Sequence, residues 1–188
     1  MSKEKSDSNL IWKIGNKEKL LDTPVFTVCQ SQNTAPDGKS GKYISIDAPD
    51  WAAVIPVLDS DFLMVRQWRH AYKGLSLEFP GGVVDSGESP EEGARRELLE
   101  ETGFEAKSLL CLGSVSPNPA LFSNRFHVFL AEGLTAAGGQ KLDDDEFLNC
   151  ERISQEEVFK KMGGPECPHA LMAAALELYV QHVKNKRP

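Results

Sequence analysis

Long apolar runs are absent from this sequence. No stretch approaches the roughly 18 apolar residues that a membrane-spanning helix needs, and residues 1–9, MSKEKSDSN, contain no apolar core of signal-peptide length. The 188 residues also contain no internal repeat and no low-complexity tract. We therefore expect neither membrane insertion nor export, and one globular domain with room for at most a small appendage.

Cysteine is scarce, and basic residues are outnumbered. The four cysteines share no CxxC spacing and no neighbouring histidine pair, so we expect reduced thiols in a cytoplasmic protein rather than a zinc site. The formal net charge is −7, which argues against the basic face that nucleic acids and anionic membranes require. We expect neither as a partner. A small anionic substrate stays possible, because a bound metal reverses the local field.

The most informative stretch is 82–104, which reads GVVDSGESPEEGARRELLEETGF. Ser89, followed by Pro90 and then by Glu92, predicts a capped helix start. Gly103 predicts the end of the same helix. The stretch is therefore expected to be a short loop that leads into one helix.

Three carboxylates fall on one face of this predicted helix. Glu97 and Glu101 are four residues apart, and Glu100 is three residues from Glu97. Like charges so placed repel, so the face is either solvated or neutralised by divalent cations, and hard oxygen ligands favour Mg²⁺ or Mn²⁺. An isolated acidic run of this kind is usually a solvated face.

This run is not isolated, because fixed residue types surround it at fixed spacing. They are Gly82, Glu88, Arg96, Glu97, Leu98, Glu100, Glu101, Gly103 and Phe104. Together they match every fixed position of the Nudix box, so the chain resembles a Nudix hydrolase. The resemblance implies an α/β (α+β) protein, an α/β/α sandwich with a mixed sheet. Alternating strand patterns with one early helix and two late helices fit the same fold.

The chain divides into three expected segments. Residues 1–9 are charged and are expected to be a disordered tail. Residues 10–50 read as a small antiparallel β-section with strands LIWKI, TPVFTVCQS and KYISIDA, and residues 51–188 are expected to form the Nudix hydrolase domain. A section this small is barely stable alone, so it should pack on the main domain or on a second copy of the chain.

Further elements of the main domain follow from local signals. The turn residues 59–61 between two apolar runs predict a hairpin, and SLLCLGSV and NRFHVFLAEGL predict later strands. Ser154 with Glu157 predicts a capped helix to about Met162. A last helix is expected over about 169–184, with an apolar stripe that belongs to the core.

The resemblance also implies a chemistry and residues for it. In Nudix hydrolases, Mg²⁺ or Mn²⁺ assists attack of water on a phosphorus of a nucleoside diphosphate linked to another group. Glu97 and Glu101 match metal-ligand positions, and Glu100 matches a residue that supports the metals or acts as base. Arg96 matches the arginine that orients the helix carboxylates. Gly81 falls where family members offer a backbone carbonyl to the metal.

Outside the box, the chain from about Val25 onward is most similar to ADP-ribose pyrophosphatases and related nucleoside diphosphate sugar hydrolases. The similarity rests on the segments VRQWRHAY and LEFPGG, on Pro119, and on an acidic loop, LDDDEF, ahead of ERISQEEVF. Transferred by position, Asp144 would be the catalytic base and Glu146 a further metal ligand. The base therefore stays open between Asp144 and Glu100, and the acidic loop could still be a solvated surface.

Candidate substrate-binding residues come from the same similarity. Arg69, or Arg66 as a nearby substitute, is expected to hold the substrate phosphates, with Glu78 and Pro119 as further candidates. Members of this subclass are dimers in which the N-terminal sheet exchanges between subunits and completes the substrate site, so a homodimer is expected. One of the tryptophans could stack on a nucleobase, although each is more commonly core or interface; they are Trp12, Trp51 and Trp68.

Two departures from the subclass leave the substrate open. FPGG replaces the usual LPAG, and Asn124 stands near the position of an acidic residue that helps to hold the distal ribose. The leading hypothesis is cleavage of the diphosphate bridge of ADP-ribose or a related nucleoside diphosphate sugar, which yields a nucleoside monophosphate and a sugar phosphate. Alternatives are a Nudix hydrolase of a dinucleotide or modified nucleoside triphosphate, and a nucleotide-sensing module without turnover.

Overall fold

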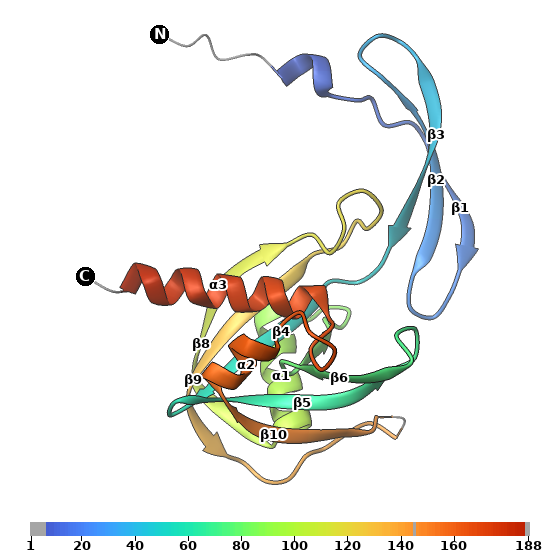
Figure 1. The fold of residues 1–188 in the computed structure, drawn as a ribbon. Helices are drawn as coiled ribbons and strands as arrows, with labels where there is room; N and C mark the ends of the chain where they lie inside the picture. The colour runs from blue at the N-terminus through green and yellow to red at the C-terminus, as the bar shows by residue number, and fades with distance from the viewer. Residues whose placement is uncertain (1–6, 145, 187–188) are drawn as a thin grey trace, which may run out of the picture. The chain divides into compact units, whose positions relative to one another are not determined.

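The structure, a computed structural model, describes residues 7–144 and 146–186 (Figure 1). The chain forms two compact units, of which the first comprises Met1–Pro49 and Asn118–Asn124 and the second Asp50–Pro117 and Arg125–Pro188. Of the predicted tail, residues 1–6 lie outside the described residues. The remainder enters a 3₁₀ turn, η1, over Asp7–Leu10.

The N-terminal unit is a three-stranded antiparallel sheet of β1 (Lys17–Asp22), β2 (Thr27–Thr34) and β3 (Ser40–Asp47), in that order. This confirms the small antiparallel section. The predicted strand LIWKI is wrong, because residues 10–14 contribute only an isolated bridge between Lys13 and Thr34. The chain next passes so close to β2 that a Cβ on Gly15 would lie 2.1 Å from the carbonyl oxygen of Gln32.

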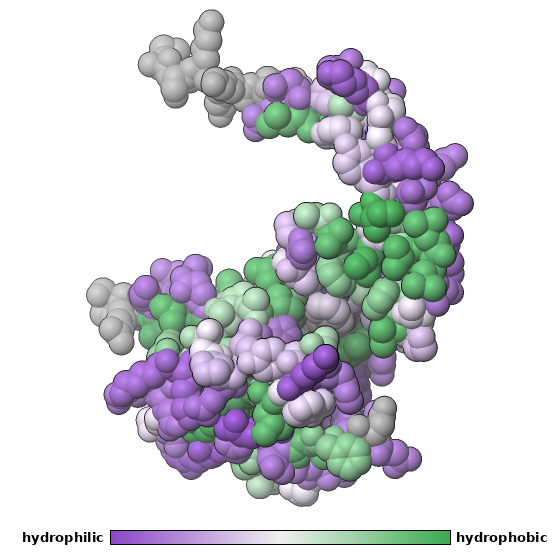
Figure 2. All heavy atoms as spheres, turned by 45° about the vertical axis from the view of Figure 1, so that its right-hand side comes forward, coloured by the Kyte–Doolittle hydropathy of each residue, from purple (hydrophilic) through white to green (hydrophobic). Residues whose placement is uncertain are grey.

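The sheet of this unit has little core of its own. Every residue of β1 is exposed, and β2 buries Cys29. Segment 118–124 is joined to β3 through the backbone of Ile46 and through the Asp47 carboxylate, which accepts a hydrogen bond of 2.8 Å from Ser123. Figure 2 shows hydrophobic side chains gathered around the β1–β2 end of the sheet. The large apolar side chains exposed on this unit include Leu10, Ile11, Ile14, Leu20, Leu21 and Val25.

The second unit is built on a mixed sheet with the order β10-β5-β4-β9-β8, to which β6 adds beside β5 and β7 beside β4. The parallel pair is β4 with β9, and the other pairs are antiparallel. The strands are β4 (Trp51–Leu58), β5 (Asp61–Arg69), β6 (Gly74–Glu78), β7 (Gly81–Val83), β8 (Phe104–Val115), β9 (Phe126–Ala136) and β10 (Leu148–Ser154).

Helices cover both faces of this sheet (Figure 1), because β4 and β9 are apolar on both sides. Successive residues of β4 point to opposite faces. Ala52 and Val54 pack with Leu98 of α1 (Pro90–Thr102), while Ala53 and Ile55 share a core with α2 (Gln155–Lys161) and α3 (Ala170–Lys186). The α/β/α sandwich is therefore confirmed. None of the described helices combines the length and the apolar composition that a membrane-spanning helix requires.

The caps predicted from sequence are present. Ser89 accepts a hydrogen bond from the backbone of Glu92, whose side chain accepts one in return from the backbone of Ser89, and Gly103 ends α1 with φ 73°. The Ser154 side chain accepts a hydrogen bond of 3.2 Å from the backbone of Glu157 and so caps α2, and that helix ends at Lys161, one residue before the predicted end. These local signals fix the ends of α1, and with them the side chains that α1 presents.

Candidate active site

Arg96 joins the loop before α1 to the carboxylates on α1. Its guanidinium donates to both oxygens of Glu88 at 3.0 and 3.1 Å and to the carbonyl of Val83 at 3.0 Å. The Nη1 atom also donates to Glu97 Oε1 at 2.9 Å and to Glu100 Oε2 at 3.1 Å. The hydrogen bonds that Arg96 donates to Glu88 and to these neighbours raise the pKa of Arg96 above its ordinary value. The arginine therefore fixes the direction of two box carboxylates.

Glu97 and Glu101 are buried, with 8% and 3% of their surface exposed. The backbone N–H of Gly81 donates to Glu101 Oε2 at 2.7 Å. A Cβ on Gly82 would lie 2.4 Å from Glu97 Oε1. The two glycines of β7 therefore bring strand backbone directly against both carboxylates, which larger residues would not permit.

Burial makes ionisation of these two carboxyl groups unfavourable. It is the main cause that raises the pKa of Glu97 to about 7 and the pKa of Glu101 to about 8, and the charge of Glu146 raises both further. Hydrogen bonds from Arg96 and from the Gly81 backbone act in the opposite direction. Around neutral pH a cation that binds this pair therefore competes with protons.

The donor chemistry of this site fits a divalent cation. Its groups are carboxylate oxygens and the backbone at Gly81, which suit hard cations such as Mg²⁺ and Mn²⁺. In the parts of the chain that the structure describes, no three His, Cys, Asp or Glu side chains already converge as metal ligands. The residues that could hold a cation are thus Glu97 and Glu101 on α1. Glu146, in the loop before β10, adds a negative charge that acts on both.

That loop brings one predicted residue into electrostatic reach of α1. Glu146 is exposed, its Oε2 accepts a hydrogen bond of 3.3 Å from the backbone of Asp143, and its charge acts on both Glu97 and Glu101. Asp144 lies exposed in the turn before it. Asp145, also part of the predicted acidic run, lies outside the described residues.

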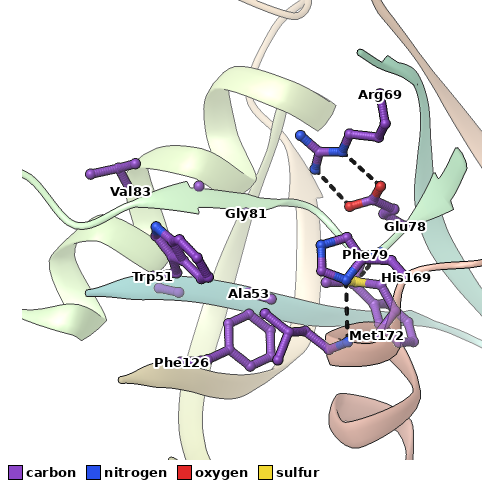
Figure 3. Close-up of a pocket in the computed structure, with 13 residues that line it drawn as sticks. Trp51, Ala53, Arg69, Glu78, Phe79, Gly81, Val83, Phe126, His169 and Met172 are labelled. Carbon is purple, nitrogen blue, oxygen red and sulfur yellow. Dashed lines mark hydrogen bonds and ion pairs between the residues drawn. The ribbon is translucent and has the colours of Figure 1, made fainter. Parts of the chain in front are cut away.

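A cavity of about 300 Å³ opens beside the box (Figure 3). Arg69 and Glu78, both predicted substrate-binding residues, form a two-pronged ion pair in its wall, with Nε–Oε1 at 2.8 Å and Nη2–Oε2 at 2.7 Å. Burial disfavours the charge on Glu78, but Arg69 outweighs it and the pKa of Glu78 lies below its ordinary value. The lining is Trp51, Ala52, Ala53, Arg69, Glu78, Phe79, Gly81, Gly82, Val83, Phe126, His169, Leu171 and Met172.

Two other candidates occupy different surroundings. Arg66 does not line this cavity; it pairs with Glu151 across β5 and β10, at 2.5 Å from Nε to Oε1. Pro119 lies in segment 118–124 of the N-terminal unit. Asn124, in the same segment, is buried and donates to the carbonyl of Pro49 at 2.7 Å. Of the two arginines, Arg69 is the one placed beside the box.

The cavity also contains residues to which the sequence assigned no role. Phe126, His169 and Met172 line it, together with Trp51, one of the three tryptophans considered for base stacking. Phe126 lies beside Trp51 because the two residues are partners in the parallel β4–β9 ladder. His169 lies directly before α3. The sequence predicted only that a helix begins at about this residue. Nothing local marks either residue as part of a cavity, because β-pairing and chain return bring them there.

The chain is similar in sequence and in fold to known proteins. A family model described as NUDIX domain matches residues 48–173. An ADP-ribose pyrophosphatase of Bacillus subtilis (strain 168) is 33% identical over 167 residues, which are 88% of this chain and 90% of that protein. An ADP-sugar pyrophosphatase of Mus musculus is 39% identical over 84 residues, 42% of this chain and 38% of that protein. A solved structure described as an ADP compounds hydrolase has a TM-score of 0.83 at 26% identity, covering 94% of this chain and 96% of that chain.

Proposed function

Because this chain belongs to the Nudix family, we propose that it cleaves the diphosphate bridge of ADP-ribose or a related nucleoside diphosphate sugar, with Mg²⁺ or Mn²⁺ as cofactor. The products are a nucleoside monophosphate and a sugar phosphate. The chain is thus a hydrolase of phosphorus-containing anhydrides. Relatives named for ADP-ribose and ADP-sugars support this substrate class.

One observation carries the proposal: two buried carboxylates, Glu97 and Glu101, stand beside a cavity whose wall holds the Arg69–Glu78 ion pair. Burying two carboxyl groups is costly unless a cation compensates them. A cationic guanidinium across from them suits an anionic ligand. Both features are what binding of a metal with a diphosphate would require.

We assign the metal to Glu97, Glu101 and the carbonyl of Gly81, with Glu146 as a further ligand. A divalent cation bound there would neutralise charge on the phosphoryl oxygens and make a bound water more acidic. Arg96 holds Glu97 and Glu100 in place through its hydrogen bonds.

Hydrolysis adds water to one phosphorus and breaks its bond to the bridging oxygen. The proton lost by the water goes to a general base, which is Asp144 or Glu100. Arg69 would hold the phosphates, while Glu78 fixes the guanidinium by occupying its Nε and Nη2. Trp51 and Phe126 give the cavity an aromatic wall that suits the apolar face of a base or sugar.

The proposal includes a homodimer formed through the N-terminal unit. The exposed apolar side chains of that sheet support it, since single subunits rarely leave so many exposed together. Pro119, in segment 118–124, stays a candidate for substrate contact, as does Arg66.

A substrate panel tests the proposed function. The purified protein is incubated with Mg²⁺ and ADP-ribose, ADP-glucose, GDP-mannose, a diadenosine polyphosphate or a nucleoside triphosphate, and the products are separated by ion exchange. We expect AMP and ribose 5-phosphate from ADP-ribose, and loss of turnover by at least about 100-fold in Glu101→Gln. Turnover confined to dinucleotides or triphosphates would overturn the substrate class. Binding of one compound without turnover of any would overturn the enzyme assignment.

A further inference from the structure

His169 stands at the point where the loop after α2 becomes α3. Its carbonyl accepts hydrogen bonds from the backbone of Met172 at 3.0 Å and of Ala173 at 3.4 Å, which marks it as the residue that caps the helix. Its side chain takes part as well, because Nδ1 accepts a hydrogen bond of 3.2 Å from the backbone N–H of Leu171.

This contact fixes the tautomer of the imidazole. Because Nδ1 accepts a hydrogen bond, it carries no proton of its own. The single proton of a neutral imidazole is therefore on Nε2. Protonation of Nδ1 would place two donors against each other. Burial lowers the pKa of His169, with the charge of Glu78 opposing and that of Arg69 assisting. The start of a 17-residue helix also disfavours a positive charge. The ring is therefore a neutral donor through Nε2.

The donor faces the cavity beside the box. His169 lines that cavity together with Arg69 and Gly81. In Figure 3 the ring nitrogen that Leu171 does not contact is turned toward the interior of the cavity. Nε2 is therefore available to a ligand, whereas Nδ1 is committed to the helix.

Other donors in this wall are partly occupied. Glu78 accepts from Nε–H and from one Nη2–H of Arg69, so the guanidinium keeps the other Nη2 hydrogen and both Nη1 hydrogens for an incoming anion. The oxygens of a diphosphate can accept several hydrogen bonds. The free donors of one guanidinium are too few to supply them all. A neutral second donor supplies a hydrogen bond without adding charge next to Arg69.

The position of His169 is held by the strand that also carries Glu78. The backbone N–H of Leu77 in β6 donates to the carbonyl of Glu166 at 2.8 Å, and Cys167, in the same loop, is fully buried. The loop before α3 is therefore attached to β6 next to the ion pair. His169 is thus fixed relative to Glu78 rather than on a free loop.

We propose that His169 is a substrate-binding residue whose Nε2–H donates a hydrogen bond to a phosphoryl oxygen of the diphosphate held by Arg69. The proposal deepens the proposed function and rests on it for the ligand class. Because the hydrogen bond forms in the bound substrate and persists in the transition state, its loss should raise KM more than it lowers kcat.

The test separates the substrate contact from the helix cap. Asparagine is a good cap, so His169→Asn keeps an acceptor for the Leu171 N–H but is too short to place a donor where Nε2 stands. We expect a melting temperature close to that of the wild type, a KM for ADP-ribose about 10-fold higher and a kcat within about 2-fold. His169→Ala should show the same KM and a lower melting temperature. Ser154→Ala, which removes the cap of α2 outside the cavity, should lower the melting temperature alone.

Calorimetric titration in EDTA gives a second readout that does not depend on turnover. His169→Asn should weaken ADP-ribose and ADP equally, by about 10-fold, and leave adenosine binding unchanged. Weaker binding of ADP-ribose with unchanged binding of ADP would place the contact at the sugar and overturn the phosphoryl assignment. If KM and the affinities are unchanged in His169→Asn while His169→Ala is less stable, His169 is only a helix cap. Turnover of the substrate panel would in that case still support the proposed function. Wild-type protein that neither hydrolyses any compound of the panel with Mg²⁺ nor binds ADP-ribose or ADP would overturn both proposals.

Discussion

Glu97 and Glu101 link the pH of the solution to the stability of the metal-free protein. Both bind a proton more tightly in the folded chain, where their pKa values are about 7 and about 8, than in the unfolded chain, where the ordinary value is 4.5. Their contribution to stability is therefore complete below about pH 4.5 and is lost as the pH rises through the folded values.

We expect the melting temperature in EDTA to fall between about pH 5 and about pH 8. The fall should be smaller in Glu101→Gln, which cannot titrate at that position. Excess Mg²⁺ should raise the melting temperature more at about pH 8 than at about pH 6, because it replaces protons that are already leaving. Differential scanning calorimetry across this range measures all three. A melting temperature in EDTA that does not change with pH would contradict the account.

Gly82 is needed for the space that its missing side chain leaves. A Cβ there would meet Glu97 Oε1 at 2.4 Å, and this atom is the end of a flexible side chain, so the chain can fold by moving the carboxylate. We expect Gly82→Ala to keep its melting temperature within a few degrees and to require about 10-fold more Mg²⁺ for half-maximal rate. Gly139→Ala is the matched control, since a Cβ at Gly139 meets nothing within 4 Å. An unchanged Mg²⁺ requirement in Gly82→Ala would remove Glu97 from the metal site.

The general base comes either from helix α1 or from the loop before β10. Glu100 is held by Arg96, whereas Asp144 lies exposed on the loop. If Asp144 is the base, Asp144→Asn should lower kcat by about 100-fold or more at saturating Mg²⁺. Glu146→Gln should instead raise the Mg²⁺ requirement, because it removes a charge that acts on Glu97 and Glu101.

Asp143→Asn on the same loop is the control and should keep the wild-type rate. A normal rate in Asp144→Asn together with a fall of about 100-fold in Glu100→Gln would assign the base to α1. Rates measured by product release at several Mg²⁺ concentrations separate the loss of the base from the loss of metal affinity.

Elements whose signals are local could be predicted from the sequence, and elements that depend on distant partners could not. The ends of α1 follow from Ser89 and Gly103, and the box spacing brings Arg96 to Glu88 and Glu97 within one helix and its preceding loop. LIWKI has the composition of a strand, but strand formation needs a partner along its length, and residues 10–14 find a single bridge.

The wall of the cavity could not be predicted from the sequence either, because it also depends on distant partners. The Arg69–Glu78 pairing depends on the register of β5 with β6, in which Arg69 pairs with Gly74 and Val65 with Glu78. His169 reaches the cavity through a loop that attaches to β6 by the backbone of Glu166, and backbone hydrogen bonds leave no mark in the residue types. The sequence therefore named the chemical groups of the box, while the wall facing them required the tertiary structure.

The N-terminal unit leaves large apolar side chains exposed to solvent. Leu21 is 55% exposed and Val25 is 67% exposed, and every residue of β1 lies open to solvent. A three-stranded sheet with such a surface gains little stability by itself. The β5–β6 hairpin of the second unit also exposes large side chains; these are Trp68, Tyr72 and Leu75. Surfaces of this kind are typical of subunit contacts.

We expect the protein to sediment at about twice its chain mass of 20.7 kDa at micromolar concentration. The double variant Leu21→Asp/Val25→Asp places two charges on the apolar end of the sheet, so it should sediment as a monomer and lose at least about 10-fold in kcat/KM for ADP-ribose. Phe159→Asp on α2, at a residue 43% exposed in the second unit, should stay dimeric and active. A wild-type monomer would contradict the dimer. A monomeric double variant with full activity would leave the dimer intact and exclude a substrate site shared between subunits, because each chain would then carry every group that the reaction needs.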